Sequence, residues 1–270
     1  MSVEHEELKR IEAEPLELSV KFADLAGKSV FLTGGGSGIG AYFLQGFLLA
    51  GARVGYVDLP ADHHAPLCAL LATRYGSAPL FYPADVRDAS ALESAMAQFA
   101  ADFGPADVIV NNAARDTRHL LADWDADQFT ESINLNLRPH YLTARYFAPA
   151  MAANGGGSII NMSSASYLLK MAGMPAYVAA KAAVTGLTGA LARELGPDNI
   201  RVNALIPGWV MTERQKALWA TPDALATAAN GQALKQQIAP ADMVAPCLFL
   251  ASEASRMMSA QTLVVDGGWT

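Results

Sequence analysis

The chain is poor in cysteine, has no long apolar run and carries no excess of basic residues. Its two cysteines, Cys68 and Cys247, form neither a Cys-x-x-Cys pair nor a metal-ligand spacing, which argues against a disulfide framework and suits a reducing compartment. The 19 Lys and Arg residues are outnumbered by 26 Asp and Glu, so neither nucleic acid nor an anionic membrane is an expected partner. No apolar stretch is long enough for a membrane span, and the acidic N-terminus lacks the basic-then-apolar order of a secretion signal. These absences predict a cytoplasmic protein without a bound metal.

The remaining composition is that of a folded domain with an atypical N-terminus. Of the 270 residues, 52% are hydrophobic and 17% charged, which is enough to bury a large core. Residues 1–24 differ, because seven acidic residues there face only three basic ones. We expect this stretch to be an extension that packs on the surface or on a neighbouring subunit, with a partly ordered tail as the alternative. Residues 25–270 are expected to form one domain.

Short apolar runs alternate with longer stretches of helical pattern from residue 28 onward. The runs predict seven strands, at residues 29–33, 53–57, 79–82, 107–111, 157–162, 200–206 and 261–265. Helices are expected at residues 38–50, 63–75, 88–103, 125–153 and 176–196. Strands that alternate with helices form parallel sheets, so the expected fold is an α/β, doubly wound, Rossmann-type domain. Residues 212–240 break the alternation and are expected to form a lid.

A glycine-rich turn follows the first predicted strand and opens the first helix of the domain. It contains Gly34, Ser37, Gly38, Ile39 and Gly40. Glycines let the backbone approach a pyrophosphate closely, and the helix N-terminus offers free N–H groups to it. The second strand ends at Asp58, which can accept hydrogen bonds from an adenosine ribose and would repel a 2′-phosphate. The turn and this carboxylate together predict a dinucleotide site that takes NAD rather than NADP.

Several spaced motifs identify a family. They are the glycine-rich turn, Asn111-Asn112-Ala113-Ala114, Ser164, Tyr177-x-x-x-Lys181 and Pro207-Gly208. Over residues 25–270 this combination resembles the short-chain dehydrogenase/reductase family, whose members are usually tetrameric. Ala114 departs slightly from the family pattern, which has glycine at this position. The resemblance implies cofactor contacts from Asp85, Val86, Asn112, Ala113, Tyr177, Lys181, Pro207, Gly208, Val210 and Thr212.

Tyr177 and Lys181 stand four residues apart in a predicted helix, so they share one of its faces. A nearby cation favours the phenolate of a tyrosine, which is otherwise a poor base at neutral pH. Ser164 is expected to hold the substrate oxygen, with Ser163 as the second choice. The resemblance implies an active-site asparagine, for which Asn136 fits better than Asn134, although a helix kink is expected at Pro139. The inferred reaction is hydride transfer from a hydroxyl-bearing carbon to NAD.

The substrate is predicted from the loops that follow the fourth, fifth and sixth strands. Arg118 and His119 lie in a polar loop after the fourth strand. Trp209 and Trp219 flank the loop after the sixth strand, and polar groups beside an indole suit a carbohydrate. Further segments, among them Asn136-Leu-Arg and Thr212-x-Arg-Gln, resemble bacterial NAD-dependent aldose dehydrogenases, which oxidise the anomeric hydroxyl of a sugar to a lactone. A polyol or secondary-alcohol dehydrogenase, a 3-oxoacyl-carrier-protein reductase and, remotely, a non-catalytic NAD sensor are the alternatives. His63 and His64 are expected to begin a surface helix.

Overall fold

A seven-stranded parallel sheet forms the centre of the computed structural model, which describes residues 2–270. The strand order is β3-β2-β1-β4-β5-β6-β7, and every neighbouring pair is parallel. The strands are β1 Ser29–Thr33, β2 Arg53–Asp58, β3 Leu80–Pro83, β4 Val108–Asn111, β5 Gly157–Met162, β6 Ile200–Pro207 and β7 Thr262–Val265. All seven lie where the sequence predicts them. The order reverses between β1 and β4, and in such sheets a crevice for a ligand opens at the carboxyl ends of these strands.

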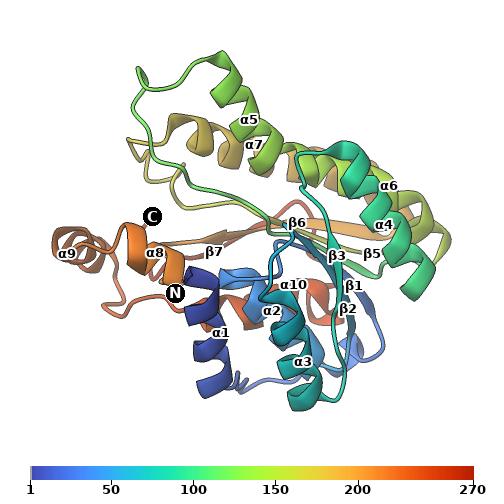
Figure 1. The fold of residues 1–270 in the computed structure, drawn as a ribbon. Coiled ribbons are helices and arrows are strands. Elements are labelled where there is room, and N and C mark those ends of the chain that lie inside the picture. The colour runs from blue at the N-terminus through green and yellow to red at the C-terminus, as the bar shows by residue number, and fades with distance from the viewer. Residues whose placement is uncertain (1) are drawn as a thin grey trace.

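Helices cover both faces of the sheet (Figure 1). One face carries α2 Gly38–Leu49, α3 His64–Tyr75 and α10 Val244–Ala251, and the other carries α4 Ala89–Phe103, α5 Ala126–Asn136, α6 Arg138–Ala153 and α7 Pro175–Leu195. Successive side chains of β1 alternate between the two cores, because the residues of a strand point alternately to opposite faces. Leu32 belongs to the core beneath α2, while Phe31 packs against Phe99 and Phe147 on the other side. Short 3-10 helices lie at Ala23–Leu25, Gly196–Asp198, Pro240–Met243 and Glu253–Ser255.

The single helix expected over residues 125–153 is two helices. The chain leaves helical geometry at Leu137, with φ −131° and ψ −52°, so α5 ends at Asn136 and α6 begins at Arg138. The expected kink at Pro139 is therefore wrong, because the break between the helices lies at Leu137. Proline has no N–H to donate, and Pro139 occupies the first turn of α6, where no such donor is needed.

The N-terminal extension contains a helix, α1 Val3–Ala13, with Ser2 as its N-cap. The C-terminal carbonyls of α1 accept hydrogen bonds from Arg74 of α3, at 2.7 Å to Ile11 and 2.9 Å to Glu12. It also packs against α8 Glu213–Leu218. The extension thus packs on its own domain.

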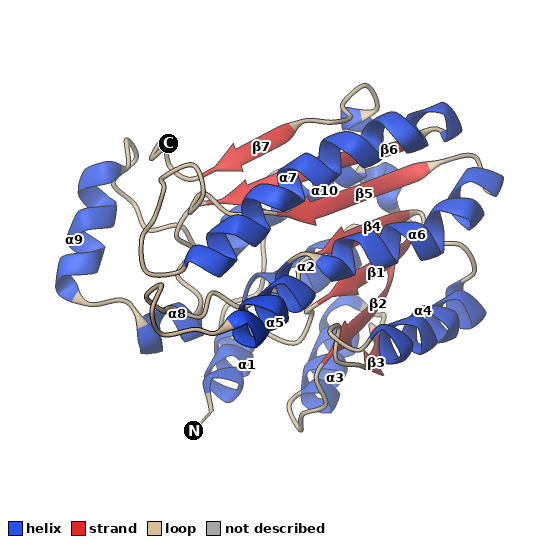
Figure 2. Cartoon of the chain, turned by 90° about the horizontal axis from the view of Figure 1, so that it is seen from above, coloured by secondary structure: helices blue, strands red, loops and turns tan. Residues whose placement is uncertain are grey.

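The segment expected to be a lid forms α8 and α9 Pro222–Gly231. Figure 2 places both helices beyond the end of the sheet toward which the strand arrows point. A parallel bridge between Val210 and Ile238 closes the base of this segment. The segment therefore lies next to the crevice of the sheet. Among residues 2–270, no helix is both long and apolar enough to cross a membrane.

Candidate active site

A cleft of about 840 Å³ opens at the carboxyl ends of the strands. The cofactor-site residues expected from the sequence line it almost completely: Gly34, Ser37, Gly38, Ile39, Asp58, Asp85, Val86, Asn112, Ala113, Tyr177, Pro207, Gly208, Val210 and Thr212. Gly40 and Lys181 do not line the cleft and lie behind its wall. The cleft is large enough to hold a dinucleotide together with a small substrate.

The glycine-rich turn is shaped by backbone geometry that glycine favours. Gly34 has φ +72° and Gly38 φ +55°, both in the left-handed region. Asn112 fixes the turn from the side, because its Nδ2 donates to the carbonyl of Gly34 at 2.8 Å. Ser37 is the N-cap of α2 but makes no capping hydrogen bond through its side chain. The first N–H groups of α2 are thus left without a side-chain acceptor at the wall of the cleft, as pyrophosphate binding requires.

Gly40 lets helix α2 pack closely against the glycine-rich turn, because glycine has no Cβ. A Cβ on Gly40 would lie 1.8 Å from the carbonyl oxygen of Gly34, so the turn must move in Gly40→Ala. We expect at least about a 30-fold loss of dinucleotide affinity and about 1–3 kcal/mol lower stability, the usual cost of overpacking. Isothermal titration and thermal melts measure both quantities.

Gly186→Ala is the matched control for this substitution. Gly186 also lies inside a helix, α7, but its added Cβ would meet nothing within 4 Å. Alanine favours helices, so this variant should keep its cofactor affinity and gain up to about 1 kcal/mol. Equal affinities for the two variants would contradict the role assigned to Gly40.

Asp58 presents its carboxylate at the edge of the cleft. Oδ2 accepts the N–H of Gly36 at 2.8 Å and Oδ1 accepts the N–H of Leu59 at 2.8 Å. Each oxygen keeps a lone pair that could accept a ribose hydroxyl. Atoms of His63 and His64 lie within 3 Å of where a Cβ on Gly36 would stand, so a basic side chain has no room there. These features fit a ribose without a 2′-phosphate.

The two histidines at the start of α3 are not a surface pair. His63 is 8% exposed and His64 is 2% exposed, so the expectation of a surface helix is wrong at this end. His64 is hydrogen-bonded to the Tyr56 hydroxyl at 3.1 Å and to the Leu59 carbonyl at 2.8 Å. His63 lines the cleft, and its Nε2 is buried without a partner. Burial lowers the pKa of His63, which keeps its ring neutral at neutral pH.

Ser164 and Tyr177 meet in the cleft in front of Lys181. Lys181 is 1% exposed, donates from Nζ to the Met162 carbonyl at 2.8 Å, and places Nζ 5.7 Å from the centre of the Tyr177 ring. Burial lowers the pKa of Lys181 to about 7. Burial also raises the pKa of Tyr177, as does the nearby Asp116 carboxylate, while a hydrogen bond with Ser164 lowers it. The phenol therefore needs further positive charge beside it before it can act as a base.

The alternatives considered for the serine and the asparagine differ clearly in their surroundings. Ser163 points away from the cleft and donates to the Lys181 carbonyl at 2.7 Å. Asn136 is 1% exposed and lies behind the cleft wall, where its Oδ1 accepts the N–H of Arg115 at 2.9 Å. Asn134 instead bonds to Glu131 on the outer side of α5. Asn136 thus ties the end of α5 to the loop after β4.

His140 is a buried group near this centre that the sequence did not single out. It lies in α6, is 1% exposed, and neither ring nitrogen has a hydrogen-bond partner. Burial and the Lys181 charge lower its pKa to about 3. The ring is therefore neutral at any pH at which the protein is expected to work.

A polar network that the sequence did not identify lines one part of the cleft. Gln215 of α8 donates to Asp116 at 2.8 Å and accepts the Trp209 indole N–H at 2.8 Å. Arg214 forms an ion pair with Asp116 at 3.5 Å. The signal was present in the polar loop after β4 and in Thr212-x-Arg-Gln, but their meeting depends on the fold.

The three residues predicted to contact the substrate differ in whether they line the cleft. Trp209 lines the cleft within the network described above. Arg118 also lines the cleft, with its guanidinium 4.4 Å from the centre of the Trp219 ring. His119 does not line it, because its ring is buried in a stack on Trp124 at 3.5 Å between centres. His119 therefore supports the loop and does not face the ligand.

Comparisons with known proteins agree with this geometry. Residues 34–270 match the family profile described as enoyl-(acyl carrier protein) reductase. A Rhizobium meliloti protein named probable galactose dehydrogenase is 46% identical over 250 residues, which cover 93% of this chain and 98% of the relative. The D-xylose 1-dehydrogenase of Caulobacter vibrioides is 40% identical over 253 residues, covering 93% and 99%. Among solved structures, L-sorbose reductase from Gluconobacter frateurii, complexed with NADPH and L-sorbose, has a TM-score of 0.86 at 27% identity, covering 92% and 98%.

Proposed function

Because this chain belongs to the short-chain dehydrogenase/reductase family, and is thus an oxidoreductase that acts on CH–OH groups, we propose that it oxidises the anomeric hydroxyl of an aldose to a lactone with NAD. One observation carries the choice of a sugar: the Asp116, Gln215 and Trp209 network faces the same cleft as Tyr177. Fixed carboxylate and amide groups beside an indole suit the hydroxyls and the apolar face of a sugar ring. The sugar dehydrogenases among the relatives support this choice.

Four residues of the chain have separate roles in the proposed proton transfer. Ser164 holds the reacting hydroxyl by a hydrogen bond, and the Tyr177 phenolate takes its proton as a general base. Lys181, fixed by the Met162 carbonyl, supplies positive charge behind Tyr177 when it is protonated, and a bound nicotinamide cation would add the further charge that the phenol needs. Asn136 keeps the loop after β4 in place and is a positioning residue. When bound, the nicotinamide supplies the acceptor for the hydride that leaves the substrate carbon.

NAD rather than NADP is proposed as the cofactor. The Asp58 carboxylate stands where an adenosine ribose is expected, and its negative charge disfavours a 2′-phosphate. Gly36 leaves no space for a basic side chain that could bind such a phosphate.

A substrate panel tests the proposed function. The purified protein is assayed for reduced cofactor with aldoses, polyols and simple secondary alcohols, each with NAD and with NADP at mildly alkaline pH. We expect turnover of one or a few aldoses, with NAD preferred over NADP by at least about 10-fold. Activity on polyols or apolar alcohols without aldose turnover would overturn the sugar assignment, and a preference for NADP would overturn the cofactor assignment.

Location and assembly complete the proposal. A cytoplasmic location is proposed from the reduced cysteines and the need for a shared pool of NAD. A homotetramer is proposed from membership of the family. The strand β7 at the edge of the sheet supports association, because Val264 is 38% exposed there.

A further inference from the structure

The helix α1 forms part of the wall of the cofactor cleft. Val3, Glu4 and Glu7 line the cleft together with the glycine-rich turn and Asp58. The helix lies outside residues 34–270, the part of the chain that matches the family profile. Figure 1 shows α1 beside α2, with its N-terminal end next to α8. This wall of the cleft is therefore formed by residues outside the part of the chain that matches the profile.

Polar contacts hold α1 against the lid. Arg10 forms an ion pair with Glu213 of α8 at 3.2 Å, and the buried Glu7 accepts the backbone N–H of Glu213 at 3.4 Å. Arg74 of α3 holds the C-terminal end of α1 through the carbonyls of Ile11 and Glu12. These contacts fix α1 against both α3 and α8, and so they position the helix at the cleft.

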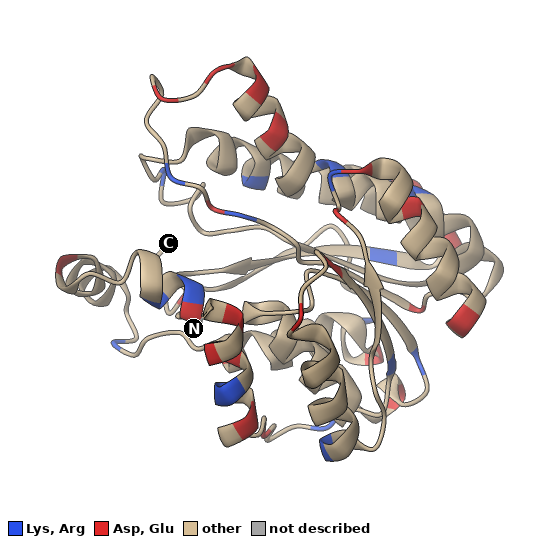
Figure 3. Cartoon of the chain, viewed as in Figure 1, with Lys and Arg blue, Asp and Glu red and all other residues tan. Residues whose placement is uncertain are grey.

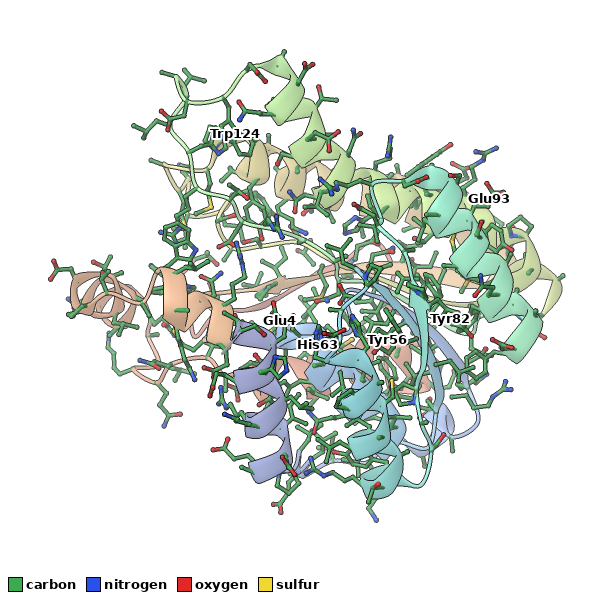
Figure 4. The ribbon with its side chains drawn as sticks, in the orientation of Figure 1. Glu4, Tyr56, His63, Tyr82, Glu93 and Trp124 are labelled. Carbon is green, nitrogen blue, oxygen red and sulfur yellow. The ribbon has the colours of Figure 1, made fainter. Side chains whose placement is uncertain are left out.

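Glu4 faces the adenosine end of the cleft. Figure 4 shows Glu4 of α1 beside His63 at the start of α3. Figure 3 shows acidic positions along α1, including the end next to α8. The backbone N–H groups at the start of α1 and Ser2 lower the pKa of Glu4, so it is ionised at neutral pH.

His63 gives an independent sign that a ligand binds here. Its side chain is more than nine-tenths buried, and its unpartnered Nε2 lies 2.9 Å from where a Cβ on Gly36 would stand. Asp58 Oδ2 lies at the same distance from that point. A buried ring nitrogen without a partner is costly unless a ligand satisfies it. A neutral imidazole can bond to a ribose hydroxyl but offers no charge to a phosphate.

On the premise of the NAD-dependent reaction above, we propose that α1 is a specificity element of the dinucleotide site, in which Glu4 joins Asp58 in excluding a 2′-phosphate. Two fixed negative charges at the adenosine ribose repel a phosphate dianion more than Asp58 alone does. The neutral diol of NAD experiences no such repulsion, and His63 is available to bond to it.

The test compares two charge-removing variants of the same helix. Glu4→Gln removes the charge at the cleft, and Glu12→Gln removes an identical charge on the exposed side of α1, away from the cleft. Fluorescence titration gives the affinities for NADH and NADPH in the full-length protein without substrate. For Glu4→Gln we expect NADPH to bind about 5- to 10-fold more tightly and NADH to stay within about 2-fold of wild type. Glu12→Gln should change neither affinity.

Cofactor affinities in high salt and in a second variant, Glu4→Lys, extend the test. The gain of Glu4→Gln should shrink in 1 M salt, where the screening length falls to about 3 Å. Glu4→Lys should increase the gain further. If wild type binds NADH and Glu4→Gln behaves like Glu12→Gln, or changes both cofactors equally, the inference is overturned. If wild type binds neither cofactor, the proposed function itself fails.

Discussion

Replacement of Tyr177 by phenylalanine is expected to lower kcat by about 10³- to 10⁴-fold, the upper part of the range for loss of a general base. The ring lines the cleft in front of Lys181, and phenylalanine keeps that ring while removing the hydroxyl proposed to accept the substrate proton. NADH affinity should stay within about 3-fold of wild type, since the phosphate turn and Asp58 are untouched. Steady-state kinetics and fluorescence titration measure the two quantities.

Tyr167→Phe is the matched control for this result. Tyr167 lies only ten residues earlier and carries the same hydroxyl, but it does not line the cleft and contacts Thr185 at 3.3 Å. Its loss should leave kcat within about 2-fold of wild type. A Tyr177→Phe enzyme with unchanged activity and normal NADH binding would refute the proposed mechanism.

Replacement of Lys181 by methionine should lower the activity of the enzyme but raise its stability. We expect kcat to fall by at least about 10²-fold, because Tyr177 loses the amine that favours its phenolate when that amine is protonated. The buried amine has a pKa of about 7, well below its ordinary value of 10.5, so folding disfavours its charged form. Methionine fills similar space without that cost. Allowing for the lost bond to the Met162 carbonyl, the variant should gain of the order of 2 kcal/mol at pH 7 or below.

The pH dependence of stability distinguishes the removal of a buried amine from a change in side-chain packing alone. The unfolded chain binds the extra proton between about pH 7 and 10.5, so wild-type stability should rise with pH across this window. The advantage of Lys181→Met should therefore be greatest below pH 7 and vanish near pH 10.5. Thermal melts of the cofactor-free protein should show a Tm gain of about 4–8 °C at neutral pH. A lower Tm at neutral pH would contradict the prediction.

The sequence by itself determined the sheet and the positions of most of the groups proposed as catalytic. All seven strands lie where their apolar runs predict, because a strand covered on both faces must be apolar throughout. The glycine-rich turn, Asp58 and the spacing of Tyr177 and Lys181 are local features, since each depends on residues within one strand, turn or helix. Local patterns of this kind can be interpreted without knowing which distant segments meet.

Tertiary structure decided the parts of the site that join distant segments. Gln215 meets Asp116 across 99 residues, and Arg10 meets Glu213 across 203. Sequence patterns also placed His63 on the surface and His119 at the ligand, whereas both are buried and only His63 lines the cleft. No local propensity encodes these outcomes, because each depends on which side chains the folded sheet brings together from opposite ends of the chain. The sequence thus determined the proposed reaction centre, while only the fold decided which distant residues line the rest of the cleft.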